Sequence, residues 1–168
     1  MTTTLRLILV ALLGALLAAG GTATAVPTPG PAAPSPEAAG IAKEERKVIA
    51  LTNKRREAHG CDPLGYRKSL RTAARRHTNR MAEAGELSHQ LPGEPDLGRR
   101  VTNAGYKNWT MVAENIAVGY PTPRAVVRGW MASEGHRENI LNCRLKHIGV
   151  GLVRADGVAW WTQVFGAN

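Results

Sequence analysis

Apolar and charged residues alternate with a helical period through much of the chain. In residues 41–58 the apolar positions fall on one side of a strongly charged segment, and in residues 69–84 they again share one face, with Gly85 as a stop signal. Both spacings predict amphipathic helices. His77 falls on the apolar face of the second helix, so we expect a hydrogen-bonded core histidine there rather than a ligand.

Weaker signals predict further helices later in the chain. Residues 86–97 are typical of a polar loop, and residues 97–104 of a short helix. Thr122 and Pro123 form a helix start, with threonine as the N-cap and proline at the first helical position. The apolar spacing after this start includes Trp130, which we expect to anchor the core.

Two strand-like runs close the sequence. Residues 148–152 alternate between large apolar and small residues, and residues 158–165 are rich in aromatic and β-branched side chains. Asp156 and Gly157 lie between the runs and supply a turn, which predicts an antiparallel hairpin. Because the helices come first and the hairpin last, without βαβ alternation, the pattern predicts an α+β domain.

The first 25 residues have the pattern of a signal peptide. Arg6 gives a short positive region, residues 7–17 are apolar, and residues 23–25 supply small residues around a cleavage site. A retained membrane anchor is the alternative, but the apolar run is short for a span of roughly 20 residues. We expect residues 1–25 to be removed and the protein to be secreted, with no transmembrane segment after cleavage.

A linker and one domain follow. Residues 26–36 contain five prolines and no charge, a composition that favours extended conformations, so we assign residues 26–40 to a linker. Residues 41–168 have the length of one compact domain.

The charge of the chain favours anionic partners without naming one. The net charge is +9, and removal of Arg6 with the signal peptide leaves about +8. A basic exported protein is attracted to anionic surfaces of the cell envelope. No nucleic-acid-binding motif is present and the basic residues lack interleaved aromatics, so we expect no specific nucleic-acid partner.

Cys61 and Cys143 are the only two cysteines. In an exported chain such a pair is expected to form a disulfide, and no CxxC spacing favours a metal instead. A loop of this length corresponds to a stabilisation of about 3–5 kcal/mol in the loop-entropy model. The assignment also removes both cysteines as candidate nucleophiles.

Candidate chemistry gathers in residues 129–142, which carry an acid, a histidine and an amide just after a helical pattern ends at Gly135. We therefore expect these polar groups at the end of an element, where binding residues concentrate. Two earlier segments, residues 87–90 and 113–117, are candidate partners, and together the three segments would bring two histidines and a carboxylate to one place. These side chains are His89, Glu114 and His136.

Five motifs occur in order along the chain: Ser88-His89, Glu114-Asn115-Ile116-Ala117, Gly129-Trp130 to Leu141, Ile148-Gly149-Val150-Gly151 and Trp161-Thr162-Gln163-Val164-Phe165-Gly166. They resemble those of the CAP superfamily, which unites cysteine-rich secretory proteins, antigen 5 and plant pathogenesis-related 1 proteins. The similarity runs from about Ile49 to the end of the chain, and it is strongest to the secreted bacterial SCP-like branch. It implies an α-β-α sandwich, with a central antiparallel sheet flanked by helices.

The resemblance also implies a cleft with two histidines and two glutamates, which binds a divalent cation in some members. His89, Glu114 and His136 match three of these positions. Ser133 stands where the family has the other glutamate, and the neighbouring Glu134 would point elsewhere on a helix. The tetrad is therefore incomplete here.

Two interpretations of the cluster remain open. In the first, His89 and His136 bind Zn²⁺ or another divalent cation, and Glu114 is either the third ligand, a group that orients a histidine, or a general base. In the second, the three side chains form a hydrogen-bonded cluster that ties loops together without metal.

The leading functional hypothesis is an extracellular or cell-envelope binding module for a lipid, glycan or peptide, with Ser133 among the cleft residues. The alternative is a metal-assisted extracellular hydrolase of the peptidase kind, with His89, Glu114 and His136 as its catalytic residues. A serine nucleophile has little support, because no Gly-x-Ser-x-Gly elbow is present and Ser88 is near a histidine only in sequence.

Overall fold

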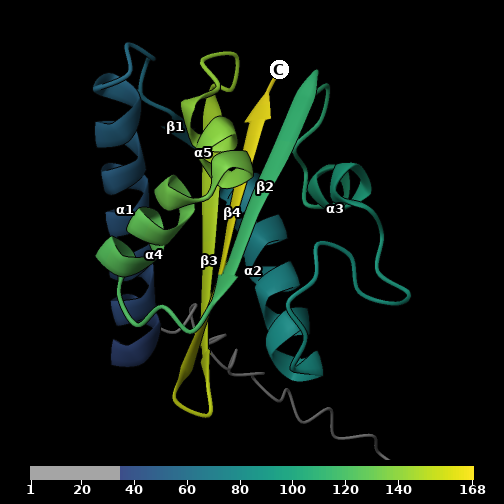
Figure 1. The fold of residues 1–168 in the computed structure, drawn as a ribbon. Coiled ribbons are helices and arrows are strands. Elements are labelled where there is room, and N and C mark those ends of the chain that lie inside the picture. Colours follow the sequence, from purple (N-terminus) through teal and green to yellow (C-terminus); the bar gives the residue numbers. More distant parts are fainter. Residues whose placement is uncertain (1–34) are drawn as a thin grey trace, which may run out of the picture. The chain divides into compact units, whose positions relative to one another are not determined.

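A computed structural model describes residues 35–168 (Figure 1). The predicted signal peptide and most of the predicted linker lie outside the described residues. The first helix, α1, spans Pro36–Glu57, so it begins before residue 41, where the apolar pattern begins. The Ser35 side chain accepts a hydrogen bond from the Ala38 amide and caps the helix. None of the described helices is both long and apolar enough to cross a membrane.

The centre of the domain is a four-stranded sheet with the strand order β1-β3-β4-β2. The pair β3–β4 and the pair β4–β2 are antiparallel, and the very short β1 runs parallel to β3. The central strand β4 is buried from its second residue to its last. The strands are β1 (Gly65–Tyr66), β2 (Met111–Val118), β3 (His147–Ala155) and β4 (Val158–Ala167).

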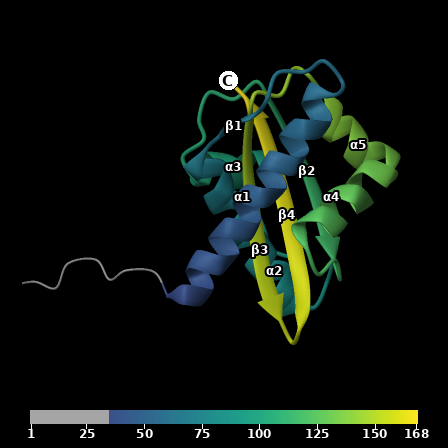
Figure 2. The ribbon, with the colours of Figure 1, turned by 90° about the vertical axis from the view of Figure 1, so that its left-hand side faces the viewer.

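Helices cover both faces of the sheet and make an α-β-α sandwich (Figures 1 and 2). On one face α1 packs beside α4 and α5, and on the other face α2 lies along β3 and β4 with α3 next to it. The predicted fold class is confirmed. The remaining helices are α2 (Lys68–Ala84), α3 (Leu97–Asn103), α4 (Pro123–Ala132) and α5 (Glu134–Leu141).

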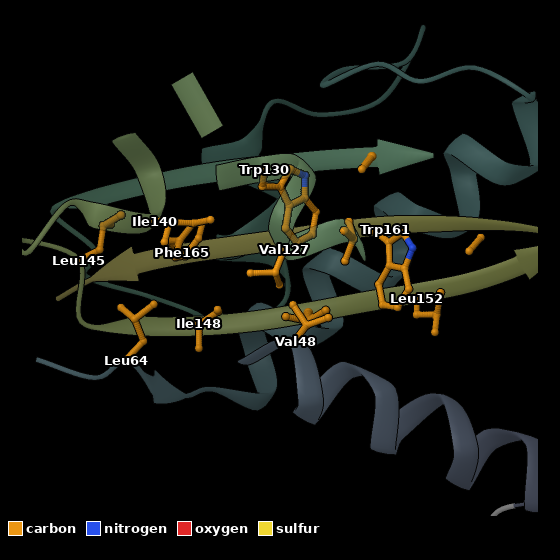
Figure 3. Close-up of a cluster of buried hydrophobic side chains, with 14 residues drawn as sticks. Val48, Leu64, Val127, Trp130, Ile140, Leu145, Ile148, Leu152, Trp161 and Phe165 are labelled. Carbon is orange, nitrogen blue, oxygen red and sulfur yellow. The ribbon is translucent and has the colours of Figure 1, made fainter. Parts of the chain in front are cut away.

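The larger apolar core lies between the sheet and the α1 face. Trp130 from α4 meets Trp161 and Phe165 from β4 there, and Val48 from α1 closes the cluster (Figure 3). The Trp130 side chain is buried and its Nε1 donates to the Ile116 carbonyl at 3.1 Å. Trp130 is thus a core anchor, as its helical spacing predicts.

The opposite face is held by close contact between backbones. A Cβ atom at Gly149 would collide with the backbone of α2 at Leu70 and Arg71, and one at Gly151 would lie 2.7 Å from the carbonyl carbon of Ala74. Only glycine permits this approach. The contact fixes the position of α2, which carries His77 toward the sheet.

The residues predicted to begin or end helices and to form the hairpin turn have these roles in the structure. Thr122 accepts a hydrogen bond from the Ala125 amide at the start of α4, and Gly85 ends α2 with a φ of 65°. Asp156 and Gly157 both have positive φ, as in the turn that matches the twist of a hairpin.

Two expectations were wrong. No strand was predicted over β2, and the helical pattern was expected to end at Gly135. The chain instead breaks at Ser133, which has extended backbone angles, and Gly135 lies inside α5. The segment with His136 is therefore the first turn of a helix rather than the end of one.

A buried arginine ties α1 to the segment after α5. The Arg56 guanidinium is fully buried and donates to four carbonyl oxygens, those of Asp62, Ile140, Asn142 and Leu145, at 2.8–3.0 Å. Burial lowers the pKa of Arg56. The predicted disulfide between Cys61 and Cys143 joins the same two segments.

Replacing Arg56 by methionine should lower the free energy of unfolding by about 3–5 kcal/mol, because several buried carbonyls lose their donor. Urea unfolding followed by circular dichroism measures the change. The matched control is Arg55→Met, because Arg55 is exposed on the same turn. A similar loss in both variants would contradict a special role for the buried guanidinium.

Candidate functional site

Glu114 is a buried carboxylate on β2. It pairs with Arg100 from α3, whose Nη1 lies 2.8 Å from Oε2 and whose Nη2 lies 3.1 Å from Oε1. Arg100 Nη2 also donates to the backbone carbonyl of His89 at 2.9 Å. A single guanidinium therefore fixes both the carboxylate and the loop that carries the histidine.

His89 is held by the same carboxylate while it faces solvent. Its Nδ1 lies 3.0 Å from Glu114 Oε1, yet its side chain is 59% exposed. Since Glu114 accepts, the Nδ1–H donates and Nε2 is the ring nitrogen left for another partner. The predicted contact between His89 and Glu114 is present in the structure.

His77 stands behind Glu114 in the core. Its Nδ1 donates to Glu94 Oε2 at 2.9 Å, and its Nε2 lies 3.7 Å from Glu114 Oε1. It is a hydrogen-bonded core histidine, as expected, but it also joins the candidate site from within. Arg100 and Glu94, which complete the network, were not predicted from the sequence.

The electrostatic balance keeps Glu114 ionised. Burial favours the neutral acid, but hydrogen bonds from His89 and Arg100 and the positive charges of Arg100 and His77 outweigh it, so the pKa of Glu114 is lowered. The carboxylate is therefore a fixed negative charge whose two oxygens are already occupied.

His136 lies in the first turn of α5 and is partly buried. Burial lowers its pKa, and the nearby charge of His89 lowers it further, so the neutral imidazole is favoured. Its backbone carbonyl accepts a hydrogen bond from the Asn115 side chain at 3.1 Å, and Asn139 donates to Asn115 Oδ1 at 2.9 Å. These amides attach α5 to β2 beside Glu114.

The two candidate serines do not support a nucleophile. Ser133 is exposed between α4 and α5, and no hydrogen bond connects its side chain to another residue in the described part of the chain. The Ser88 hydroxyl donates to the Gln90 carbonyl at 2.9 Å rather than to a histidine. Glu134 is also exposed, at the start of α5.

The donor set does not fit a three-ligand metal site. Within residues 35–168 no group of three or more histidine, cysteine, aspartate or glutamate side chains is arranged to hold a metal ion. Glu114 is committed to Arg100 and His89 on both oxygens, and a neighbouring cation opposes metal binding. The hydrogen-bonded cluster of the second interpretation is present for His89 and Glu114, but within the described residues no hydrogen bond joins the His136 imidazole to either of them.

A zinc titration by calorimetry near neutral pH tests this conclusion. We expect only weak binding, which a His89→Ala/His136→Ala double variant reduces further, because two imidazoles fall short of the three protein ligands usual in catalytic sites. Tight binding at one zinc per chain, lost in the double variant, would contradict it.

Replacing Glu114 by glutamine should lower the free energy of unfolding at pH 7 by about 3–5 kcal/mol, because Arg100 becomes a buried charge without a partner. Since the folded pKa lies below the ordinary 4.5, the stabilisation from ionised Glu114 is present above pH 4.5 and is lost as the pH falls through the folded value. The difference in free energy of unfolding between the original protein and the Glu114→Gln variant should therefore become smaller at acidic pH.

Urea unfolding over a pH series measures the effect, with Glu83→Gln as the control for an exposed glutamate on α2. A difference that stayed constant from neutral to acidic pH would show that the charge of Glu114 is not its cause.

Comparison with known proteins is consistent with the fold. The chain is 40% identical over 127 residues to the Bacillus subtilis protein YkwD, and 34% identical over 121 residues to the B. subtilis membrane protein YlbC. The matches cover 74% and 72% of this chain. They span only 48% and 34% of those two relatives, so the chain corresponds to a part of each.

Solved structures give the same result. An extracellular protein of Bacillus anthracis that contains an SCP domain superposes with a TM-score of 0.73 at 27% identity, over 83% of this chain and 45% of that one. An outer surface protein of Borrelia burgdorferi superposes with a TM-score of 0.69 at 18% identity, over 75% and 93%, and shows the fold alone. The model of the cysteine-rich secretory protein family matches residues 49–165. With the sandwich fold and the ordered motifs, this match places the chain in the cysteine-rich secretory protein family, the CAP superfamily.

Proposed function

We propose that this chain is an exported binding domain that holds an extracellular ligand at the surface formed by His89 and His136. The Bacillus anthracis protein at 27% identity supports an extracellular setting, since it is described as extracellular. The disulfide between Cys61 and Cys143 is typical of an oxidising compartment.

The observation that carries the proposal is an exposed imidazole held by a buried carboxylate. Burying Glu114 and Arg100 costs desolvation energy, and apolar residues could fill the same space at little or no loss of stability. The network instead fixes the ring of His89, whose side chain stays 59% exposed. Fixing a polar group in advance is how a binding site reduces the entropy lost on association.

The chemistry of the surface favours a ligand with hydrogen-bond donors. With its Nδ1–H committed to Glu114, His89 offers its Nε2 to a ligand, and the lowered pKa of His136 favours the neutral imidazole there. Hydroxyl and amide groups can donate to such nitrogens. A glycan or a peptide therefore fits better than an apolar lipid.

Replacing His89 by alanine tests the role of this surface. We expect the affinity for soluble muropeptides, which carry both glycan and peptide groups, to fall about tenfold, the loss of one good hydrogen bond. The free energy of unfolding should change by less than about 1 kcal/mol, because His89 is largely exposed and Glu114 keeps its ion pair with Arg100. Calorimetry and urea unfolding measure the two quantities.

His59→Ala is the matched control, because His59 is an exposed histidine elsewhere on the domain. Equal affinity of the two variants would contradict the proposal. A His89 variant that lost stability but kept its affinity would show that the cluster is structural. Anionic lipid vesicles as a second probe separate lipid binding from binding of the glycan or peptide.

Hydrolysis is the second candidate, and the contact between His89 and Glu114 is the observation that favours it. A carboxylate that orients a histidine and stabilises its protonated form is a known arrangement for a general base acting on water. Metal assistance lacks a three-ligand set in the described residues. Release of product fragments from the same muropeptides would separate hydrolysis from binding alone.

A further inference from the structure

The helices α1 and α4 pack beside each other on one side of the sheet, and both turn basic side chains to solvent (Figure 2). Along each helix these side chains are spaced by three, four or seven residues, which puts them on one side of it. We call this surface the basic face. It consists of six exposed residues, Lys43, Arg46, Lys47, Lys54, Arg124 and Arg128.

The charge of the basic face has little local compensation. None of its six residues makes an ion pair with another residue in the described part of the chain. Glu44 lies among them, but its carboxylate is paired with Arg154 at 2.8 Å. Like charges four residues apart on a helix repel, as at Lys43 and Lys47. The basic face therefore attracts anions, and an anion bound there relieves this repulsion.

A groove lies between α1 and the start of α4, beside the row of lysines. Its volume is about 510 Å³, and Lys43, Arg46 and Lys47 line it together with Pro123. Since an α-helix rises about 1.5 Å per residue, the row from Lys43 to Lys54 is roughly 16 Å long. Cations spaced along a row of this length suit a chain of repeated anions, each of which can meet one cation.

The apolar residues around the basic face favour a polymer over a membrane. Helices that lie on a bilayer bury large apolar side chains beside their basic ones. Among residues 35–168, none of the exposed large hydrophobic residues belongs to α1 or α4. Between its cations α1 exposes only the small side chain of Ala50. The basic face therefore lacks the groups that would enter a bilayer.

We propose that the basic face binds a linear anionic polymer, which lies in the groove between α1 and α4. Ammonium and guanidinium groups hold such a chain through charge-assisted hydrogen bonds, and its condensed counterions are released. Binding of this kind weakens as the salt concentration rises. The basic face contains neither His89 nor His136, so the polymer site is separate from the proposed binding surface and does not depend on it.

Calorimetry of the purified protein with inorganic polyphosphate, at several NaCl concentrations, tests the site. The informative variant replaces four residues of the basic face, Lys43→Gln/Lys47→Gln/Arg124→Gln/Arg128→Gln. The matched control replaces two lysines and two arginines that are exposed on α2 and on the loop after α3, Lys68→Gln/Arg76→Gln/Arg80→Gln/Lys107→Gln. Both variants lose the same positive charge, so they differ only in where it is lost.

We expect the logarithm of the binding constant to fall linearly with the logarithm of the salt concentration. The slope should become shallower by about four in the basic-face variant, and by less than about one in the control. Circular dichroism should show the same fold in all three proteins, because every replaced side chain is exposed.

Equal slopes in the two variants would show that net charge alone attracts the polymer, and this result would overturn the proposal. An absence of polyphosphate binding at low salt would overturn it as well. Binding to phosphatidylglycerol vesicles without binding to polyphosphate would assign the basic face to a membrane surface instead.

Discussion

A buried negative charge needs positive partners, and the position of Glu114 imposes this requirement on one whole side of the domain. Arg100 brings α3 to the sheet, His77 approaches from α2, and His89 brings the loop between those helices. Three segments thereby converge on β2, where two smaller apolar clusters also join them to the sheet. The exposed imidazole of His89 is held in place by its hydrogen bond to the buried charge of Glu114. The buried polar network and the candidate site are therefore parts of the same hydrogen-bonded network.

The sequence predicts the elements whose signals are local. The helices with regular apolar faces, the Thr122 cap and the turn at Asp156 and Gly157 follow from spacing and backbone preference. Strand β2 does not follow from such signals, because Glu114 and Asn115 in its middle interrupt any apolar alternation. Both side chains are buried and satisfied by hydrogen bonds. The break at Ser133 depends on how α5 attaches to β2 through Asn115 and Asn139, which no local pattern reveals.

The residues of the candidate site likewise differ in whether the sequence predicts them. His89, Glu114 and His136 could be selected through motifs and family resemblance, but Arg100 and Glu94 could not, because their partners are chosen by packing. The approach of α2 to the glycines of β3 places His77 against Glu114, and that distance is a property of the folded domain. One signal was available for Arg100: it stands beside Val101, the buried residue of a short helix, where a charge is expected to have a partner.

The charge at the site also decides which ligands suit it. The family pattern has two carboxylates near the histidines, an arrangement that attracts cations. The resemblance implies that Ser133 replaces one of them in this chain, and in the structure Arg100 neutralises Glu114. The exposed imidazole of His89 therefore lies beside a carboxylate whose charge is already neutralised, on a protein whose net charge is +9. A divalent cation would gain little electrostatic attraction there, whereas a neutral or anionic ligand meets no repulsion.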